Sequence, residues 1–229
     1  MVSTCRCGGC PRPEDVAATI AEDIRALEER NTPNVRAIRR DYSRRLRFAD
    51  ASLVVKIAGE LMERYGHRWV AYELIRDHED AFRSLSEADL ERWGAGMDSW
   101  GVVDSFARTL SGPAWLHGLV SDKLIHRWVD SENRWWRRAA LVSTVALNVR
   151  SHGGTGDAER TLNVCRRLAA DDEDMVLKAL SWALRALVVH DPDAVERFLV
   201  EHEDELAARV RREVRKKLNS GLKSPGRRA

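Results

Sequence analysis

The chain has 229 residues, of which 44% are hydrophobic and 32% are charged, so it can bury a core and is not a disordered chain. Its 38 basic and 36 acidic residues leave a net charge of only +2, so the overall balance does not by itself indicate a nucleic-acid partner. It contains no apolar run long enough for a transmembrane helix and no secretory signal, which predicts a cytoplasmic protein with reduced thiols and no membrane partner.

The two ends of the chain are predicted to be tails. Residues 1–13 are polar and carry Cys5, Cys7 and Cys10. Three cysteines are one ligand short of a closed structural zinc site, so we expect a flexible tail and no bound metal. Residues 219–229 are expected to form a basic, disordered tail, which leaves residues 14–218 as a single folded domain.

Between the tails, apolar residues recur with helical spacing, and no segment alternates as a strand does. In residues 51–65, for example, Leu53, Ile57 and Leu61 follow one another at intervals of four. Ser, Gly, Asp and Pro mark the joints between helices, as at 111–113 and 191–192. We therefore predict an all-α protein, with a first helix from residue 14 and further helices over 34–47, 51–65, 68–77, 86–93, 97–110, 114–129, 135–149, 158–169, 174–190, 192–199 and 203–218.

Three of these helices resemble one another weakly. Residues 68–75, 135–142 and 175–182 read RWVAYELI, WWRRAALV and MVLKALSW. Their spacing corresponds to units of roughly 33–40 residues, each a helix pair, which is typical of HEAT and armadillo repeats. Stacked helix pairs of this kind curve and present one concave surface. The predicted fold is a right-handed α-solenoid of HEAT-like helical repeats with a concave basic face.

Tryptophan and charged residues share a face on three of the predicted helices. Trp100 and Asp104 are four residues apart, and Trp135 and Arg138 are three apart. A third helix carries a stripe of cationic and aromatic residues beside its leucine-rich core stripe, made of Lys178, Trp182 and Arg185. Stacked in parallel, these stripes would line one surface.

The composition of this surface predicts a polyanion ligand. Arg and Lys suit phosphates, and Trp offers π-faces to bases, sugars or cations. The lone carboxylate, Asp104, is not needed to bind an anion but suits a positive charge that appears during a reaction. The alternatives are that each Trp packs in the core and that Asp104 is a structural ion-pair partner of Arg138 or Arg108.

The stretch from about 95 to 190 resembles the bacterial DNA alkylation repair glycosylases of the AlkD type, which are built of HEAT-like repeats. The pieces that carry the resemblance are DSWGVVDSF at 98–106, SENRWWRRAALVS at 131–143 and KALSWALRAL at 178–187. A weaker likeness, TPNVRAIRR at 32–40, extends it over most of residues 14–218. The sequence departs from the family at Ser99, where members often have a second Trp, and at Ala186, where they often have an acidic residue.

The resemblance implies that Trp100, Asp104, Arg138 and Trp182 line a DNA-binding cleft and carry the catalysis. It implies hydrolysis of the N-glycosidic bond of cationic alkylated purines, N3-alkyladenine and N7-alkylguanine, in duplex DNA. Asp104 would stabilise the developing positive charge, the tryptophans would pack on the sugar, and Arg138 would clamp a backbone phosphate. Which of Trp135 and Trp136 faces DNA stays open.

Further DNA contacts are expected from the basic residues of the same helices and of the last helix, namely Arg137, Lys178, Arg185, Arg215 and Lys216. We expect a monomer that needs no cofactor and associates with the nucleoid. Two alternatives remain: a non-catalytic DNA-binding protein of the same fold, and an α-solenoid that binds a protein partner.

Overall fold

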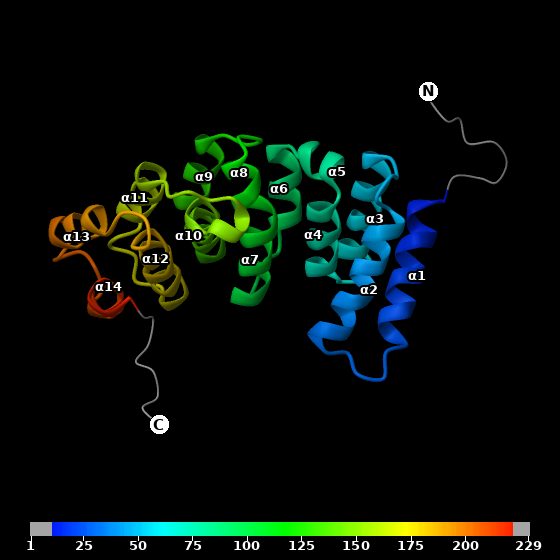
Figure 1. Ribbon diagram of the computed structural model, residues 1–229, viewed down its shortest axis with the longest axis horizontal. Coiled ribbons are helices and arrows are strands. Elements are labelled where there is room, and N and C mark those ends of the chain that lie inside the picture. Colours follow the sequence, from blue (N-terminus) through cyan, green and yellow to red (C-terminus); the bar gives the residue numbers. More distant parts are fainter. Residues whose placement is uncertain (1–10, 222–229) are drawn as a thin grey trace. The chain divides into compact units, whose positions relative to one another are not determined.

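The computed structural model describes residues 11–221, and every regular element within them is a helix (Figure 1). The prediction of an all-α protein is therefore confirmed for this part of the chain. None of its helices has the length and apolar character needed to cross a bilayer. Cys5, Cys7 and Cys10 lie outside the described residues, as does the predicted tail up to residue 10, and Pro13 at the end of that predicted tail begins α1.

The chain divides into two compact units, the first of which ends at Ser84. In it, α1 packs on α3 and α2 packs on α4, so alternate helices form two layers. Ile57 and Leu61 are fully buried, as their helical spacing predicted. The helices of this unit are α1 (Pro13–Arg25), α2 (Thr32–Arg45), α3 (Ala51–Glu63), α4 (Arg68–Asp77) and α5 (Glu79–Arg83).

The second unit begins at Leu85 and contains the remaining described helices. A π-helical turn (Ala107–Ser111) joins two of them, and a 3-10 turn (Arg150–His152) follows another. The α-helices are α6 (Glu87–Gly94), α7 (Trp100–Phe106), α8 (Gly112–Leu116), α9 (Asp122–Val129), α10 (Arg134–Asn148), α11 (Ala158–Arg167), α12 (Asp174–Leu187), α13 (Pro192–Glu201) and α14 (Ala208–Ser220).

The second unit also has two layers. One layer runs through α7, α10, α12 and α14, each of which packs on the next. The other runs through α9, α11 and α13. Figure 1 shows α11 and α13 above α12 and α14 in that view. Consecutive helices therefore alternate between layers, so side chains from helices far apart in the sequence share one face of the unit.

Helix α10 is the centre of the second unit, since it contacts α7, α8, α9, α11 and α12. Every residue from Arg138 to Asn148 is buried. A helix that is buried on all sides must be apolar or small on all sides, which explains the run Ala139 to Val142. Arg134 to Arg137 form the first turn, where side chains can still reach the surface.

The joint predicted at residues 111–113 is wrong. The chain stays helical from α7 through the π-helical turn into α8, and the break comes at 117–121, where Gly118 has a φ of 69°. Pro113 lacks an N–H and normally breaks a helix by clashing with the preceding turn. Here it follows the wider π-helical turn and lies at the start of α8, where its N–H is not needed.

Several other boundaries differ from the prediction, most clearly at α5 and α14. The short helix α5 was not predicted; it begins where the side chain of His78 accepts a hydrogen bond from the Ala81 amide. Helix α14 begins at Ala208 rather than 203 and extends to Ser220, two residues beyond the predicted end of the folded part. Helix α13 ends at Glu201, where the acidic segment 201–205 begins, because carboxylates are disfavoured at a helix C-terminus.

Candidate functional site

A cavity of about 590 Å³ opens on the α7, α10, α12 and α14 layer of the second unit. We call it the cleft. Six cationic side chains and two carboxylates line it, together with two tryptophans and a methionine. Its lining residues are Trp100, Asp104, Arg138, Met175, Lys178, Trp182, Arg185, Arg209, Arg212, Glu213 and Lys216.

Asp104 is held in the cleft by Arg138. The Nε of Arg138 donates to Asp104 Oδ1 and its Nη2 donates to Oδ2, each at 2.9 Å. The remaining nitrogen, Nη1, donates to the carbonyl oxygen of Met175 at 2.5 Å. A two-bond arginine–carboxylate pair fixes the orientation of the carboxylate as well as its position.

This geometry resolves one alternative left open by the sequence, because Asp104 does pair with Arg138. Arg108 instead lies over the ring of Trp182, 5.6 Å from its centre. The side chain of Arg138 is only 6% exposed. The phosphate expected for Arg138 would have to compete with a bidentate carboxylate and a carbonyl oxygen for the same guanidinium.

The two tryptophans expected in the site are both accessible. Trp100 is the first residue of α7 and is 60% exposed, which is far from the burial of a core tryptophan. Trp182 is partly exposed on α12. A large aromatic side chain left in water beside cations suits contact with a ligand.

Trp135 and Trp136 differ in their surroundings. The guanidinium of Arg134 lies 5.1 Å from the ring centre of Trp135. Trp136 packs against Trp128, with ring centres 4.8 Å apart, and meets Phe106 edge-on. Trp136 is therefore part of the core packing, and neither residue lines the cleft.

A chain of ion pairs connects α12 with α14. Lys178 and Arg209 share the carboxylate of Asp174, at 2.6 and 3.0 Å. Arg209 also donates to Glu213 at 2.9 Å, and the Ser181 hydroxyl donates to the same carboxylate at 2.6 Å. These pairs hold the cationic groups at fixed positions along the cleft.

Three ionisable groups in or beside the cleft have altered pKa values. The pKa of Asp174 is lowered, mainly by its hydrogen bond with Lys178. Burial raises the pKa of Glu213, but hydrogen bonds from Ser181 and Arg209 and the nearby arginine charges outweigh it, so that pKa is lowered too. Burial lowers the pKa of Arg185, which donates to the carbonyl oxygen of Ser181 at 2.9 Å. Both carboxylates therefore keep their negative charge at neutral pH.

Of the predicted DNA contacts, Lys178, Arg185 and Lys216 line the cleft and two others do not. Arg137 has a structural role instead: it pairs with the buried Asp171 at 2.6 Å and donates to the carbonyl oxygens of Ser131 and Glu132. Arg215 lies on another face of α14.

Arg209, Arg212 and Glu213 are cleft residues that were missed in the sequence. They lie on the same face of α14 as Lys216, at the spacing of one and two helical turns. The prediction took the adjacent pair Arg215 and Lys216, although neighbouring residues point about 100° apart on a helix. Applying the helical period to the whole of 208–220 would have found them.

Within residues 11–221, no group of three or more His, Cys, Asp or Glu side chains is placed to hold a metal ion. A family model described as "DNA alkylation repair enzyme" matches residues 29–218 of the chain. No curated protein sequence matches it.

Proposed function

The chain belongs to the family of DNA alkylation repair enzymes, and from that premise we propose that it is a DNA glycosylase. Its substrates would be N3-alkyladenine and N7-alkylguanine in duplex DNA. We propose that it acts as a monomer and without a cofactor. The alternating layers within each unit are compatible with HEAT-like helix pairs, and the right-handed solenoid with a basic concave face stays a prediction. That residues 14–218 form a single repeat domain stays a prediction.

The observation that carries the proposal is the placement of Asp104. Its carboxylate lies in a cavity lined by six cationic side chains and two tryptophans. A site that only bound phosphate would gain nothing from this carboxylate. An anion that is held rigidly suits a reaction in which the substrate develops positive charge.

The chemistry requires little from the enzyme beyond that anion. An alkylated purine of this class is already cationic and is a good leaving group. Its C1′–N bond breaks through a sugar with oxocarbenium character. The bonding electrons pass to the base, which leaves as a neutral purine. Water adds to C1′ and loses one proton, for which the Asp104 carboxylate is the nearest proposed acceptor.

The neighbouring groups have distinct proposed roles. Trp100 and Trp182 pack on the deoxyribose and favour its positive charge through their π-faces. Arg138 orients Asp104 and keeps it in the cleft, because its guanidinium is committed to that carboxylate. The phosphates are assigned to Lys178, Arg185, Arg209, Arg212 and Lys216.

The test is base release from duplex DNA that contains N7-methylguanine, with Asp104→Asn compared with the native chain. We expect a loss of about 10²–10³-fold, as for removal of other electrostatic catalytic groups. Asp193→Asn, at an exposed position of α13, is the matched control and should release base at the native rate. Unfolding in urea checks that Asp104→Asn is folded.

Other outcomes separate the alternatives. Release that is unaffected by Asp104→Asn would keep the enzyme and reject this mechanism. No release from the native chain, with duplex binding that weakens as salt rises, would support a non-catalytic DNA-binding protein. No salt-dependent duplex binding at all would support a protein-interaction scaffold.

A further inference from the structure

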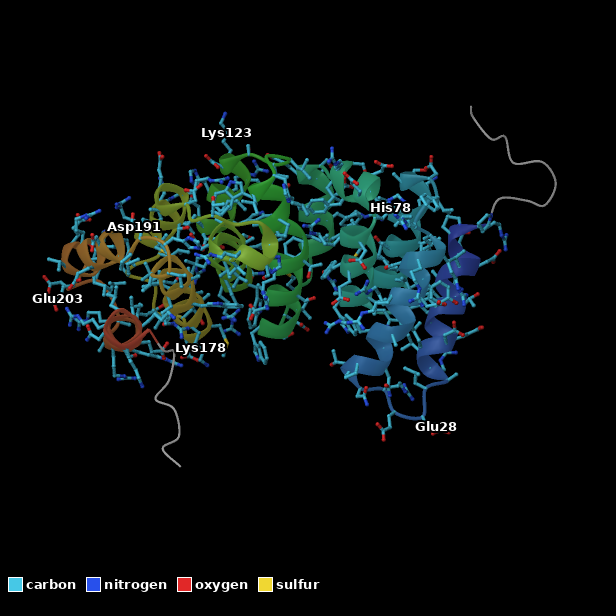
Figure 2. All side chains as sticks on the ribbon, in the orientation of Figure 1. Glu28, His78, Lys123, Lys178, Asp191 and Glu203 are labelled. Atoms are coloured by element: carbon cyan, nitrogen blue, oxygen red, sulfur yellow. The ribbon has the colours of Figure 1, made fainter. Side chains whose placement is uncertain are left out.

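Helix α14 has a second basic face. A cavity of about 810 Å³, which we call the outer groove, is lined by Glu203, Ala208, Arg211, Arg212, Arg215, Lys216, Asn219 and Ser220. Arg212 and Lys216 line the outer groove and the cleft alike. Figure 2 shows α14 nearly end-on, with the labelled Lys178 of the cleft on one side and Glu203 on the other.

Glu203 provides the acidic group of the outer groove. Its carboxylate accepts a hydrogen bond from Arg215 at 2.9 Å and lies 3.7 Å from Arg211. The hydrogen bond from Arg215, and then the charge of Arg215, lower the pKa of Glu203. A single carboxylate oxygen therefore faces two guanidinium groups, which is the arrangement that a phosphate oxygen adopts between two arginines.

We propose that the outer groove binds the DNA backbone that flanks the lesion, and that Glu203 occupies a phosphate position until DNA arrives. This inference rests on the proposed function, because it extends the path of the same duplex. Exposed ion pairs contribute little stability, so a phosphate can displace Glu203 at small cost. Each phosphate bound also releases condensed counterions from the DNA.

The chemistry of the outer groove favours a nucleic-acid backbone over a protein partner. Ala208 is its only apolar lining residue, whereas protein interfaces usually need an apolar centre. Asn219 adds a neutral donor of the kind that accompanies cations at phosphates. The 13 residues of α14 extend about 20 Å, which matches about six base pairs of duplex. Through Arg212 and Lys216, the outer groove continues directly from the cleft.

Duplex binding by Glu203→Gln and Arg215→Gln tests the proposal. The probe is a fluorescent duplex with a tetrahydrofuran abasic site, which cannot be cleaved. Glu203→Gln should bind it about two- to fivefold more tightly, because Arg215 is released from its ion pair and a negative charge is removed from the groove, while Arg211 keeps its hydrogen bond to the Glu203 carbonyl oxygen. Arg215→Gln should bind about three- to tenfold more weakly, and the slope of log affinity against log salt should fall by about one. Arg197→Gln, on α13 and outside both cavities, is the control with no change.

Trimming the duplex locates the contact. Removing about six base pairs from one particular flank should weaken the native chain and Glu203→Gln. The same trimming should weaken Arg215→Gln less than the native chain, because this variant has already lost one of its contacts with that flank. Unaltered or weaker binding by Glu203→Gln would overturn the proposal. So would an Arg215→Gln variant that is as sensitive as the native chain to trimming of either flank.

The rate of base release keeps the two proposals apart. Arg197→Gln, which lies outside both cavities, should release N7-methylguanine at the native rate, whereas the Glu203 and Arg215 variants are judged by their binding to the abasic-site duplex. If no chain releases base, the glycosylase proposal fails, while the binding measurements still decide the role of the outer groove.

Discussion

Arg138 determines what Asp104 can do. The family resemblance implied that Arg138 clamps a backbone phosphate, a role for which arginine is well suited. In the folded chain all three guanidinium nitrogens are used, two by Asp104 and one by the Met175 carbonyl. A charge removed from water in this way orients its partner far more effectively than it attracts a distant phosphate.

Substitution of Arg138 should therefore reduce base release and leave duplex affinity almost unchanged. We expect Arg138→Lys to lower the single-turnover rate about tenfold and Arg138→Gln about 100-fold, because only the lysine retains a charge beside Asp104. Duplex affinity should stay within about twofold of the native value.

Arg138→Lys is the decisive variant. Loss of the buried charge in Arg138→Gln lowers the free energy of unfolding by several kcal/mol and can unfold the chain. Urea unfolding of both variants measures that cost. Equal losses in affinity and in rate would show that Arg138 binds phosphate and does not act through Asp104.

At the scale of elements, the connection between α7 and α8 determines where Asp104 lies. The π-helical turn follows α7 directly, so it lies less than one turn beyond Asp104. At the end of this turn, the hydroxyl oxygen of Ser111 is hydrogen-bonded to the hydroxyl oxygen of Ser143 in α10, at 2.8 Å. Small residues let the two helices approach closely here, and this approach brings Asp104 within reach of Arg138. π-helical turns of this kind are frequent at functional sites.

Gly112→Ala tests that close approach. A Cβ at this position would lie 2.8 Å from the carbonyl oxygens of Ala107 and Ser143 and 2.9 Å from the Cβ of Ala146. Backbone atoms cannot move aside easily, so we expect a loss of about 2–3 kcal/mol in the free energy of unfolding, measured in urea.

Gly101→Ala in α7 is the matched control. A Cβ there meets nothing within 4 Å, and alanine restricts the unfolded chain, so a gain of about 0.5 kcal/mol is expected. Equal effects of the two substitutions would contradict the close packing of α8 on α10.

The contact between α1 and α2 predicts a pH effect in the first unit. The hydroxyl of Tyr42 on α2 donates to Asp23 of α1 at 2.7 Å. Burial, and then this hydrogen bond, raises the pKa of Tyr42 from 10.0 to about 12. Between these values the folded chain keeps a proton that the unfolded chain has lost, so rising pH favours unfolding.

Tyr42→Phe should remove this dependence. Below about pH 10, the variant should be less stable by about 1 kcal/mol because the hydrogen bond is lost. The difference from the native chain should shrink as pH rises towards 12, since the native contribution disappears there. Urea unfolding of both chains from about pH 9 to about pH 12 measures this difference in the free energy of unfolding. A constant difference would show that the phenol does not titrate as its contacts predict.

On the scale of the whole chain, the near-zero net charge conceals a strong local separation. The 38 basic and 36 acidic residues almost cancel, yet the cleft carries six cations against two carboxylates. Many basic residues elsewhere are paired: Glu73 and Asp77 neutralise Arg36 and Arg39 in the first unit, and Asp171 neutralises Arg137 in the second. Net charge is therefore a poor guide to what this protein binds, and the local field is a better one.

The sequence by itself determined most of the helices and four of the residues that line the cleft. Helical periodicity depends on neighbours three and four residues away, so it can be read along the chain for α3, α4 and α12. Trp100, Asp104, Arg138 and Trp182 could be named because their motifs are local and resemble those of a family. The same local reading failed at Pro113, where the neighbouring π-helical turn decides whether the helix continues.

Only the tertiary structure decided which charges are free and which are committed. Arg137 and Arg138 are adjacent in the sequence, but one pairs with Asp171 and the other with Asp104, 34 residues away in opposite directions. Arg209, Arg212 and Glu213 enter the cleft because α14 packs on α12. An ion pair is strong only at contact distance, and contact between distant segments is set by helix packing that local sequence patterns do not contain.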